Sequence, residues 1–264
     1  MNPSLGDGFL LGLIQGLTEF LPISSSGHLV LGQELLGFEP AGVLFEVALH
    51  IATLLSVVIA YRERLLALFR GALRREGESW RYLGLLLLAS LPAAVVGIGF
   101  RSILERAFDS GVTLAAGFLV TALALHSTRW AKPGPSPERI TPGAALLMGV
   151  AKAVAILPAV SRAGSTIVAG LWSGIGPAAA AEFSFLMSIV AVGGSGLLML
   201  TEVPPGFDLW SPGLVTAFVT ALVSGIWAIR FLVRLLRAGR VHHFAWYCAV
   251  LAVLSFAWIG FGRG

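Results

Sequence analysis

One stretch near the start of the chain, QGLTEFLPISSSGHL (Gln15 to Leu29), places reactive side chains inside an otherwise apolar region. Such groups are costly in a membrane, roughly 3 kcal/mol for a centrally placed charge, and are tolerated where they face a protein interior or a water-filled cavity. Gln15 and Glu19 are four residues apart, so they share one face of a predicted helix. The stretch therefore predicts a functional site.

The second half of this stretch predicts an anion-binding turn. Pro22 disfavours helical backbone at the residue before it, and we expect the first helix to end at Leu21. Gly27 permits a turn, and His28 opens the arm that follows. Hydroxyl groups and free backbone N–H groups at a helix N-terminus bind anions. The candidate phosphate contacts here are Ser24, Ser25 and Ser26.

A second motif, LPAVSRAGST (Leu157 to Thr166), supplies the cation that the first motif lacks. The guanidinium of Arg162 stays charged, so inside a membrane it must face an anion or a carboxylate, and its planar shape suits bidentate phosphate binding. The other phosphate-binding candidates are Ser161, Gly164, Ser165 and Thr166. A purely structural ion pair between Arg162 and Glu19 is the alternative.

Three further polar residues keep two interpretations each. Lys152 is either a second phosphate contact or a side chain that snorkels to the interface. Glu46 and His50 are four residues apart, and either extend the polar cluster or serve helix packing.

The composition is that of an integral membrane protein. Of the 264 residues, 56% are hydrophobic and only 12% are charged, and the mean hydropathy is +0.86. A soluble domain averages about 25% charged residues. The positive residues behind the net charge of +4 lie in short loops between apolar segments. This distribution is typical of the cytoplasmic loops of membrane proteins and not of a nucleic-acid-binding face.

The apolar pattern predicts an all-α fold, since no alternating strand pattern is present. About six transmembrane helices are expected, together with two regions, 22–37 and 158–177, that follow a proline and turn back as arms of re-entrant hairpins. The apolar segments are 8–21, 44–61, 83–100, 111–128, 142–157, 182–200, 213–229 and 244–262.

Loop charges give the expected topology. The loop 62–81 carries six arginines and 230–243 carries four, whereas 201–212 has none and contains Glu202 and Asp208. The first two loops are therefore expected inside and the third outside. Counting spans between them makes 142–177 a hairpin that enters from the inside. The stretch 8–37 is then a hairpin from the outside, or a single span if the N-terminus lies inside.

This count divides a single membrane domain, 1–264, into inverted repeats of about 1–137 and 138–264. A faint sequence trace agrees with it: LPISSSGHLVLG (21–32) aligns with LPAVSRAGSTIVAG (157–170), and Phe45 then matches Phe183.

The two motifs resemble those of the undecaprenyl-pyrophosphate phosphatase family, called BacA or UppP. Its first motif, (E/Q)-x-x-x-E followed by L-P-x-S-S-x-G-H, is matched from Gln15 to His28, and its second, P-G-x-S-R-S-x-x-T, from Pro158 to Thr166. The chain departs from the second motif at Ala159, where the family has Gly, and at Ala163, where it has Ser. The side chain of Ala159 disfavours a backbone conformation with positive φ, which glycine would adopt freely. Ala163 lacks the hydroxyl that serine would offer to a phosphate.

The resemblance implies an enzyme of the bacterial inner membrane that removes the terminal phosphate of the C55 isoprenyl diphosphate at a site facing the periplasm. It implies a link to bacitracin sensitivity and a divalent cation, Mg²⁺ or Ca²⁺, which Gln15 and Glu19 would hold. In the mechanism we expect, Arg162 holds the diphosphate and Ser25 attacks, with His28 taking the proton. Attack by water, or by His28 itself, would use the same residues.

Three other functions were weighed. Broken helices in inverted repeats also suit a lipid-carrier flippase. The departures Ala159 and Ala163 suit a binder of polyprenyl diphosphate that does not hydrolyse it. A type 2 phosphatidic-acid phosphatase is disfavoured, because Val168 stands where that family needs His. The sequence leaves open whether the chain acts alone or as a homodimer.

Overall fold

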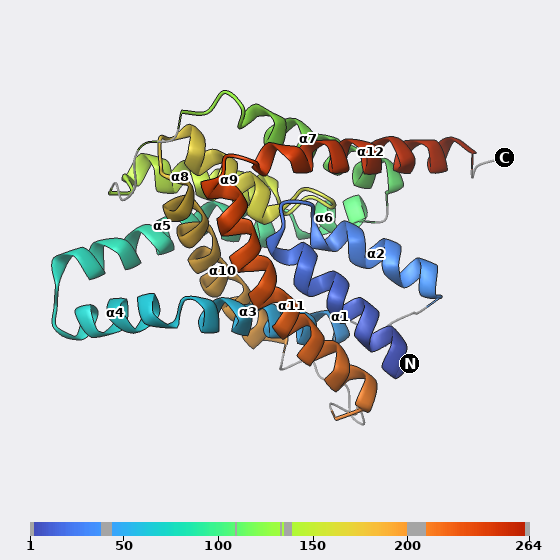
Figure 1. The fold of residues 1–264 in the computed structure, drawn as a ribbon, viewed down its shortest axis with the longest axis horizontal. Coiled ribbons are helices and arrows are strands. Elements are labelled where there is room, and N and C mark those ends of the chain that lie inside the picture. The colour runs from blue at the N-terminus through green and yellow to red at the C-terminus, as the bar shows by residue number, and fades with distance from the viewer. Residues whose placement is uncertain are drawn as a thin grey trace.

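A computed structural model describes residues 3–37, 44–108, 110–132, 134, 139–199 and 210–261. In that part of the chain all regular structure is helical, as the sequence predicts (Figure 1). The helices are α1 (Leu5–Phe20), α2 (Ser25–Leu36), α3 (Leu44–Ala60), α4 (Arg62–Leu73), α5 (Gly77–Gly99), α6 (Arg101–Phe108), α7 (Gly111–Ser127), α8 (Pro142–Val154), α9 (Arg162–Trp172), α10 (Pro177–Met199), α11 (Pro212–Arg237) and α12 (Phe244–Phe261), with a 3₁₀ turn at Val241–His243.

The two expected hairpins are present as α1 with α2 and α8 with α9, and the two arms of each pack together. The first arm ends at the predicted place, since Leu21 caps α1 in extended backbone just before Pro22. Both tips contain a residue with left-handed backbone: Ser24 with φ 72° and Ala159 with φ 58°. Each apolar run is therefore broken at its Leu-Pro sequence.

Helix packing is reciprocal between the two halves of the chain. The first arm of each hairpin packs on the second long helix of the other half, α1 on α11 and α8 on α5. Likewise α3 packs on α11 and α10 on α5, while α3 meets α10 and α7 meets α12. This exchange is the pattern expected of two repeats, whose boundary near 137 stays a prediction.

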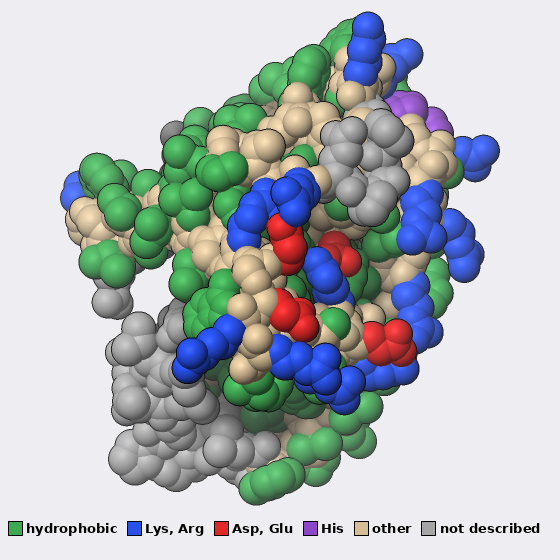
Figure 2. Space-filling view, turned by 90° about the vertical axis from the view of Figure 1, so that its left-hand side faces the viewer, with side chains coloured by type: hydrophobic (Ala, Val, Ile, Leu, Met, Phe, Trp, Pro, Cys, Tyr) green, Lys and Arg blue, Asp and Glu red, His purple; other side chains and the backbone are tan. Residues whose placement is uncertain are grey.

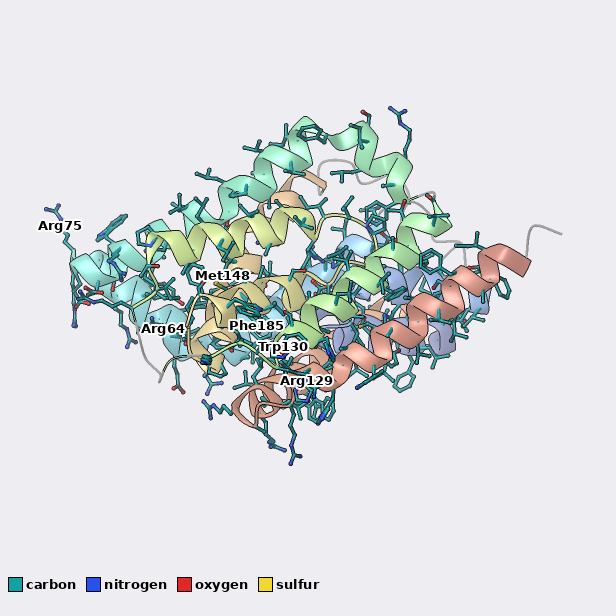
Figure 3. The ribbon with its side chains drawn as sticks, turned by 90° about the horizontal axis from the view of Figure 1, so that it is seen from above. Arg64, Arg75, Arg129, Trp130, Met148 and Phe185 are labelled. Atoms are coloured by element: carbon teal, nitrogen blue, oxygen red, sulfur yellow. The ribbon has the colours of Figure 1, made fainter. Side chains whose placement is uncertain are left out.

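Small residues permit the closest of these contacts. A Cβ atom on Gly12 of α1 would lie 2.9 Å from Cα of Ala217 in α11, and one on Gly149 of α8 would lie 3.0 Å from Cα of Ala89 in α5. Membrane helices associate through small residues of this kind, because lipid provides no hydrophobic force between them. The two hairpins are thus held by equivalent backbone contacts, and buried side chains such as Met148 and Phe185 fill the interior around them (Figure 3).

Within the described residues, three helices are long and apolar enough to cross a membrane, or up to five if each of two bent pairs is one span. The remaining candidate for the six expected spans is α10, apolar over Pro177–Val190.

The predicted loop 62–81 was wrong, because it contains α4 and the first turn of α5. α4 bends 75° from α3 and keeps its charged residues exposed, so an amphipathic surface helix was mistaken for a loop. Similarly α11 continues to Arg237 and not to 229. Lysine and arginine side chains gather at the end of the molecule that carries α4 (Figure 2). Glu202 and Asp208 lie outside the described residues.

Candidate active site

The two motifs meet at an ion pair near the hairpin tips. Nη2 of Arg162, the first residue of α9, donates to Oε1 of Glu19 at 2.9 Å, across 143 residues of sequence. The Glu19 side chain is 11% exposed and that of Arg162 37%. The ion pair that the sequence offered as a structural alternative therefore exists. Of its two side chains, that of Arg162 is the more exposed.

Glu19 also receives hydrogen bonds at its second carboxylate oxygen. Oγ of Ser25 donates to Oε2 at 2.5 Å, and Nε2 of Gln15 donates to the same atom at 3.1 Å. Nδ1 of His50 lies 3.8 Å from Oε2. A short hydroxyl–carboxylate bond both orients Ser25 and provides an acceptor for its proton.

A cavity of about 280 Å³, here called the outer cavity, opens beside this pair. Its polar lining comes from both hairpin tips and from α3, and includes Glu19, Arg162, the three consecutive serines, Ser161, Glu46 and His50. Glu46 and His50 therefore extend the polar cluster. His50 also accepts a hydrogen bond from Nε2 of Gln15 at 2.9 Å. The cavity combines a guanidinium and hydroxyls, which can donate to phosphate oxygens, with carboxylates that can accept a proton.

His28 does not lie where the expected mechanism needs it. Its Nδ1 bonds the backbone carbonyl of Ser24 at 2.7 Å, and its Nε2 bonds the hydroxyl of Tyr247 at 2.7 Å, on which the ring is also stacked. The expected hydrogen bond from Ser25 to His28 is replaced by the one to Glu19. His28 instead holds the strained Ser24, whose hydroxyl lies 3.2 Å from that of Ser26.

The second tip is stabilised by a hydroxyl that the sequence did not single out. Oγ1 of Thr121, inside the apolar helix α7, accepts from the N–H of Ser161 at 3.0 Å and bonds the carbonyl of Ala159 at 3.1 Å. Only the fold brings Thr121 to this turn, and its position in the sequence carries no signal.

Some of the remaining residues predicted to bind phosphate reach the outer cavity, and the others do not. The N–H of Gly164 is already bonded to Oγ of Ser161, which caps α9, so this backbone group is not free for a ligand. Ser165 is half-buried and lines neither cavity at the pair. Thr166 lies behind the pair and bonds Ser184. Of the second motif, Ser161 and Arg162 reach the outer cavity.

Comparison with known proteins gives one consistent result. Residues 8–254 match the family model described as bacitracin resistance protein BacA. A relative from Carboxydothermus hydrogenoformans, named undecaprenyl-diphosphatase, is 39% identical over 92% of this chain and 93% of its own. Proteins of the same name from Syntrophotalea carbinolica and Bacteroides fragilis are 40% and 37% identical, each over 94% of this chain and 96% of theirs. The chain therefore belongs to the BacA family.

Proposed function

We propose that this membrane protein hydrolyses undecaprenyl diphosphate to undecaprenyl phosphate and inorganic phosphate. The observation that carries the proposal is the contact of Ser25 with Glu19 and of Glu19 with Arg162, at the edge of a cavity that joins the two motifs. The relatives that match nearly the whole chain carry the name of this activity, and their name supplies the length of the lipid.

In the mechanism that this geometry supports, Arg162 holds the non-bridging oxygens of the terminal phosphoryl group and neutralises charge as it transfers. Oγ of Ser25 forms a bond to the terminal phosphorus, while the bond from that phosphorus to the bridging oxygen breaks. Glu19, 2.5 Å from Oγ, accepts the serine proton. Water then cleaves the phosphoserine, which releases inorganic phosphate and restores the hydroxyl.

A divalent cation, Mg²⁺ or Ca²⁺, fits the oxygen donors at this site. Gln15 is fully buried, and its Oε1 has no hydrogen-bond partner among the described residues. With a carboxylate oxygen of Glu19, it offers two of the oxygen ligands that these cations prefer. No group of three His, Cys, Asp or Glu able to hold a metal occurs in the described part, so phosphate oxygens and water would complete the shell. When bound, the cation would neutralise negative charge on the diphosphate.

The isoprenyl chain has a matching apolar groove. A groove of about 670 Å³ between α5, α6 and α8 is lined by aliphatic side chains such as Leu91, Leu104 and Val154. The chain after α8 continues into the outer cavity, which Ala155 and Ile156 line. A lipid with its diphosphate beside Arg162 would therefore extend its first isoprene units along this groove.

We propose that the outer cavity faces the exterior side of a bacterial inner membrane. Phe108 lines it and comes from the 101–110 region, which is expected outside because one span separates it from the inside loop 62–81. The arginine-rich α4 lies at the end assigned to the inside. A substrate with its diphosphate on the outer surface would then enter without crossing the membrane.

The test is phosphate release from a polyprenyl diphosphate by the detergent-purified chain, with Mg²⁺ and with chelator. Glu19→Ala and Arg162→Ala are each expected to lose release, while Glu63→Ala, on α4, and Arg74→Ala, just after it, change exposed residues and keep it. Transport of the lipid by folded wild-type protein without phosphate release would refute the proposal in favour of a flippase.

A further inference from the structure

A second, smaller cavity lies behind the Arg162–Glu19 pair. This inner cavity, of about 30 Å³, is lined by the end of α1 and by α8, α9 and α10, and it shares only Arg162 and Glu19 with the outer cavity. A volume of roughly 10–15 Å³ holds one water, so the inner cavity has room for about two oxygen atoms. The pair thus forms the boundary between two polar spaces.

Lys152 is the residue that gives the inner cavity its charge. Its side chain is 6% exposed, and Nζ donates to the backbone carbonyl of Met187 at 2.7 Å. An ammonium has three donors, and no carboxylate of the described residues forms an ion pair with this one. Lys152 does not snorkel, since it bonds a backbone carbonyl inside the protein. Two cations therefore line the inner cavity against the single carboxylate of Glu19.

The other polar lining groups are the hydroxyls of Thr166, Ser184 and Ser188, and apolar side chains of Phe20, Ala163 and Phe185 complete the wall. In the register in which Phe45 matches Phe183, Glu46 of the outer cavity corresponds to Ser184 and His50 corresponds to Ser188. The inner cavity thus has neutral donors where its counterpart has a carboxylate and an imidazole. Oγ of Ser188 donates to the backbone carbonyl of Phe185 at 2.6 Å, and rotation of the hydroxyl can turn its proton toward an anion instead. Net positive charge and hydroxyl donors in a buried space favour an oxyanion.

We propose that the inner cavity is a second oxyanion subsite, in which Lys152 and Ser188 bind oxygens of a phosphate held from the other side by Arg162. The identity of the oxyanion rests on the proposed function: it is either the terminal phosphoryl group of the lipid or the inorganic phosphate derived from it. Binding of an oxyanion in the inner cavity does not itself depend on hydrolysis.

The test is binding of inorganic phosphate to detergent-purified protein, measured by calorimetry without lipid. Lys152→Gln removes the charge and leaves a neutral, slightly shorter side chain that still carries N–H donors. It is expected to weaken phosphate binding about tenfold, the loss of one charge-assisted hydrogen bond, with an unchanged melting temperature. The matched control is Lys132→Gln, since Lys132 is exposed and is the only other lysine. Ser188→Ala changes no charge and is expected to weaken phosphate binding about threefold. A loss of affinity in this variant therefore reports a direct hydrogen bond to phosphate and not long-range electrostatic attraction.

Equal phosphate affinity in wild type, Lys152→Gln and Ser188→Ala would overturn the subsite. If Lys152→Gln fails to fold, Ser188→Ala decides alone. A raised KM for the lipid diphosphate in these variants assigns the subsite to the terminal phosphoryl group, and weaker inhibition by phosphate at unchanged KM assigns it to the freed product. Wild-type protein that binds phosphate through Lys152 but releases none from lipid would refute the proposed function and leave the subsite standing.

Discussion

The assignment of Glu19 as the proton acceptor of Ser25 can be tested by a double-mutant cycle on kcat. The variants are Ser25→Ala, Glu19→Gln and the two combined. Ser25→Ala removes the hydroxyl that lies 2.5 Å from Oε2 of Glu19. Glu19→Gln preserves the size of the side chain and removes its charge, so the amide no longer accepts the proton.

The structure fixes the expected size of each effect. A positioned general base contributes about 10²- to 10⁴-fold, which is about 2.7 to 5.4 kcal/mol of activation free energy at 1.36 kcal/mol per tenfold. Glu19→Gln should therefore lower kcat by about that factor, and Ser25→Ala, which removes the nucleophile, by at least as much. Because Glu19 acts on the proton through the Ser25 hydroxyl, the combined variant should be no more than about threefold slower than the slower single variant.

The assay is phosphate release at saturating lipid diphosphate, with melting temperature measured on the same samples. Glu63→Gln, on the exposed surface of α4, serves as the charge-loss control. Multiplied losses in the double variant, about 10⁴-fold or more, would mean that the two groups act independently, and the assignment would then fail.

Three further predictions follow from the same site. Arg162→Lys should lower kcat/KM about 100-fold, because an ammonium cannot make the bidentate contact; near-normal hydrolysis would refute the role of Arg162. Ala159→Gly should raise the free energy of unfolding by up to about 1 kcal/mol, since relief of positive φ is worth roughly 1–2 kcal/mol and the lost methyl about 0.8 kcal/mol; a denaturant titration that shows clear destabilisation would contradict this. Tyr247→Phe removes the hydroxyl that bonds Nε2 of His28; it should lower kcat by less than tenfold without moving the pH profile, and a shifted profile would instead identify His28 as the base.

The hairpins and the meeting of the two motifs were predictable because polar residues and a proline inside an apolar run have few explanations. Such groups must face one another or water, so the two motifs were expected to form one site, with a Glu19–Arg162 ion pair as the structural alternative. The contact at 2.9 Å shows that the motifs meet through this pair. The helical class followed equally directly, since a membrane-embedded backbone must satisfy its own hydrogen bonds.

Contacts set by helix rotation were not predictable. Three serines and a histidine within five residues suggested a Ser25–His28 pair, but α2 begins at Ser25 and turns His28 toward α12. Tyr247 and Thr121 lie in apolar segments, and the sequence around them gives neither residue a role at the site. Each gains its role from a neighbour more than a hundred residues away or on another helix, which periodicity alone does not reveal.

The Arg162–Glu19 pair is better explained as part of a ligand-binding site than as a contact that stabilises the packing of the two hairpins. A buried ion pair rarely contributes net stability, because desolvation offsets the attraction. The packing of α1 on α11 and of α8 on α5 already holds both hairpins. Glu19 accepts bonds from Arg162, Ser25 and Gln15 and is 11% exposed, whereas the arginine is 37% exposed and lines both cavities. The carboxylate thus fixes one edge of the guanidinium and leaves its other N–H groups for a phosphate.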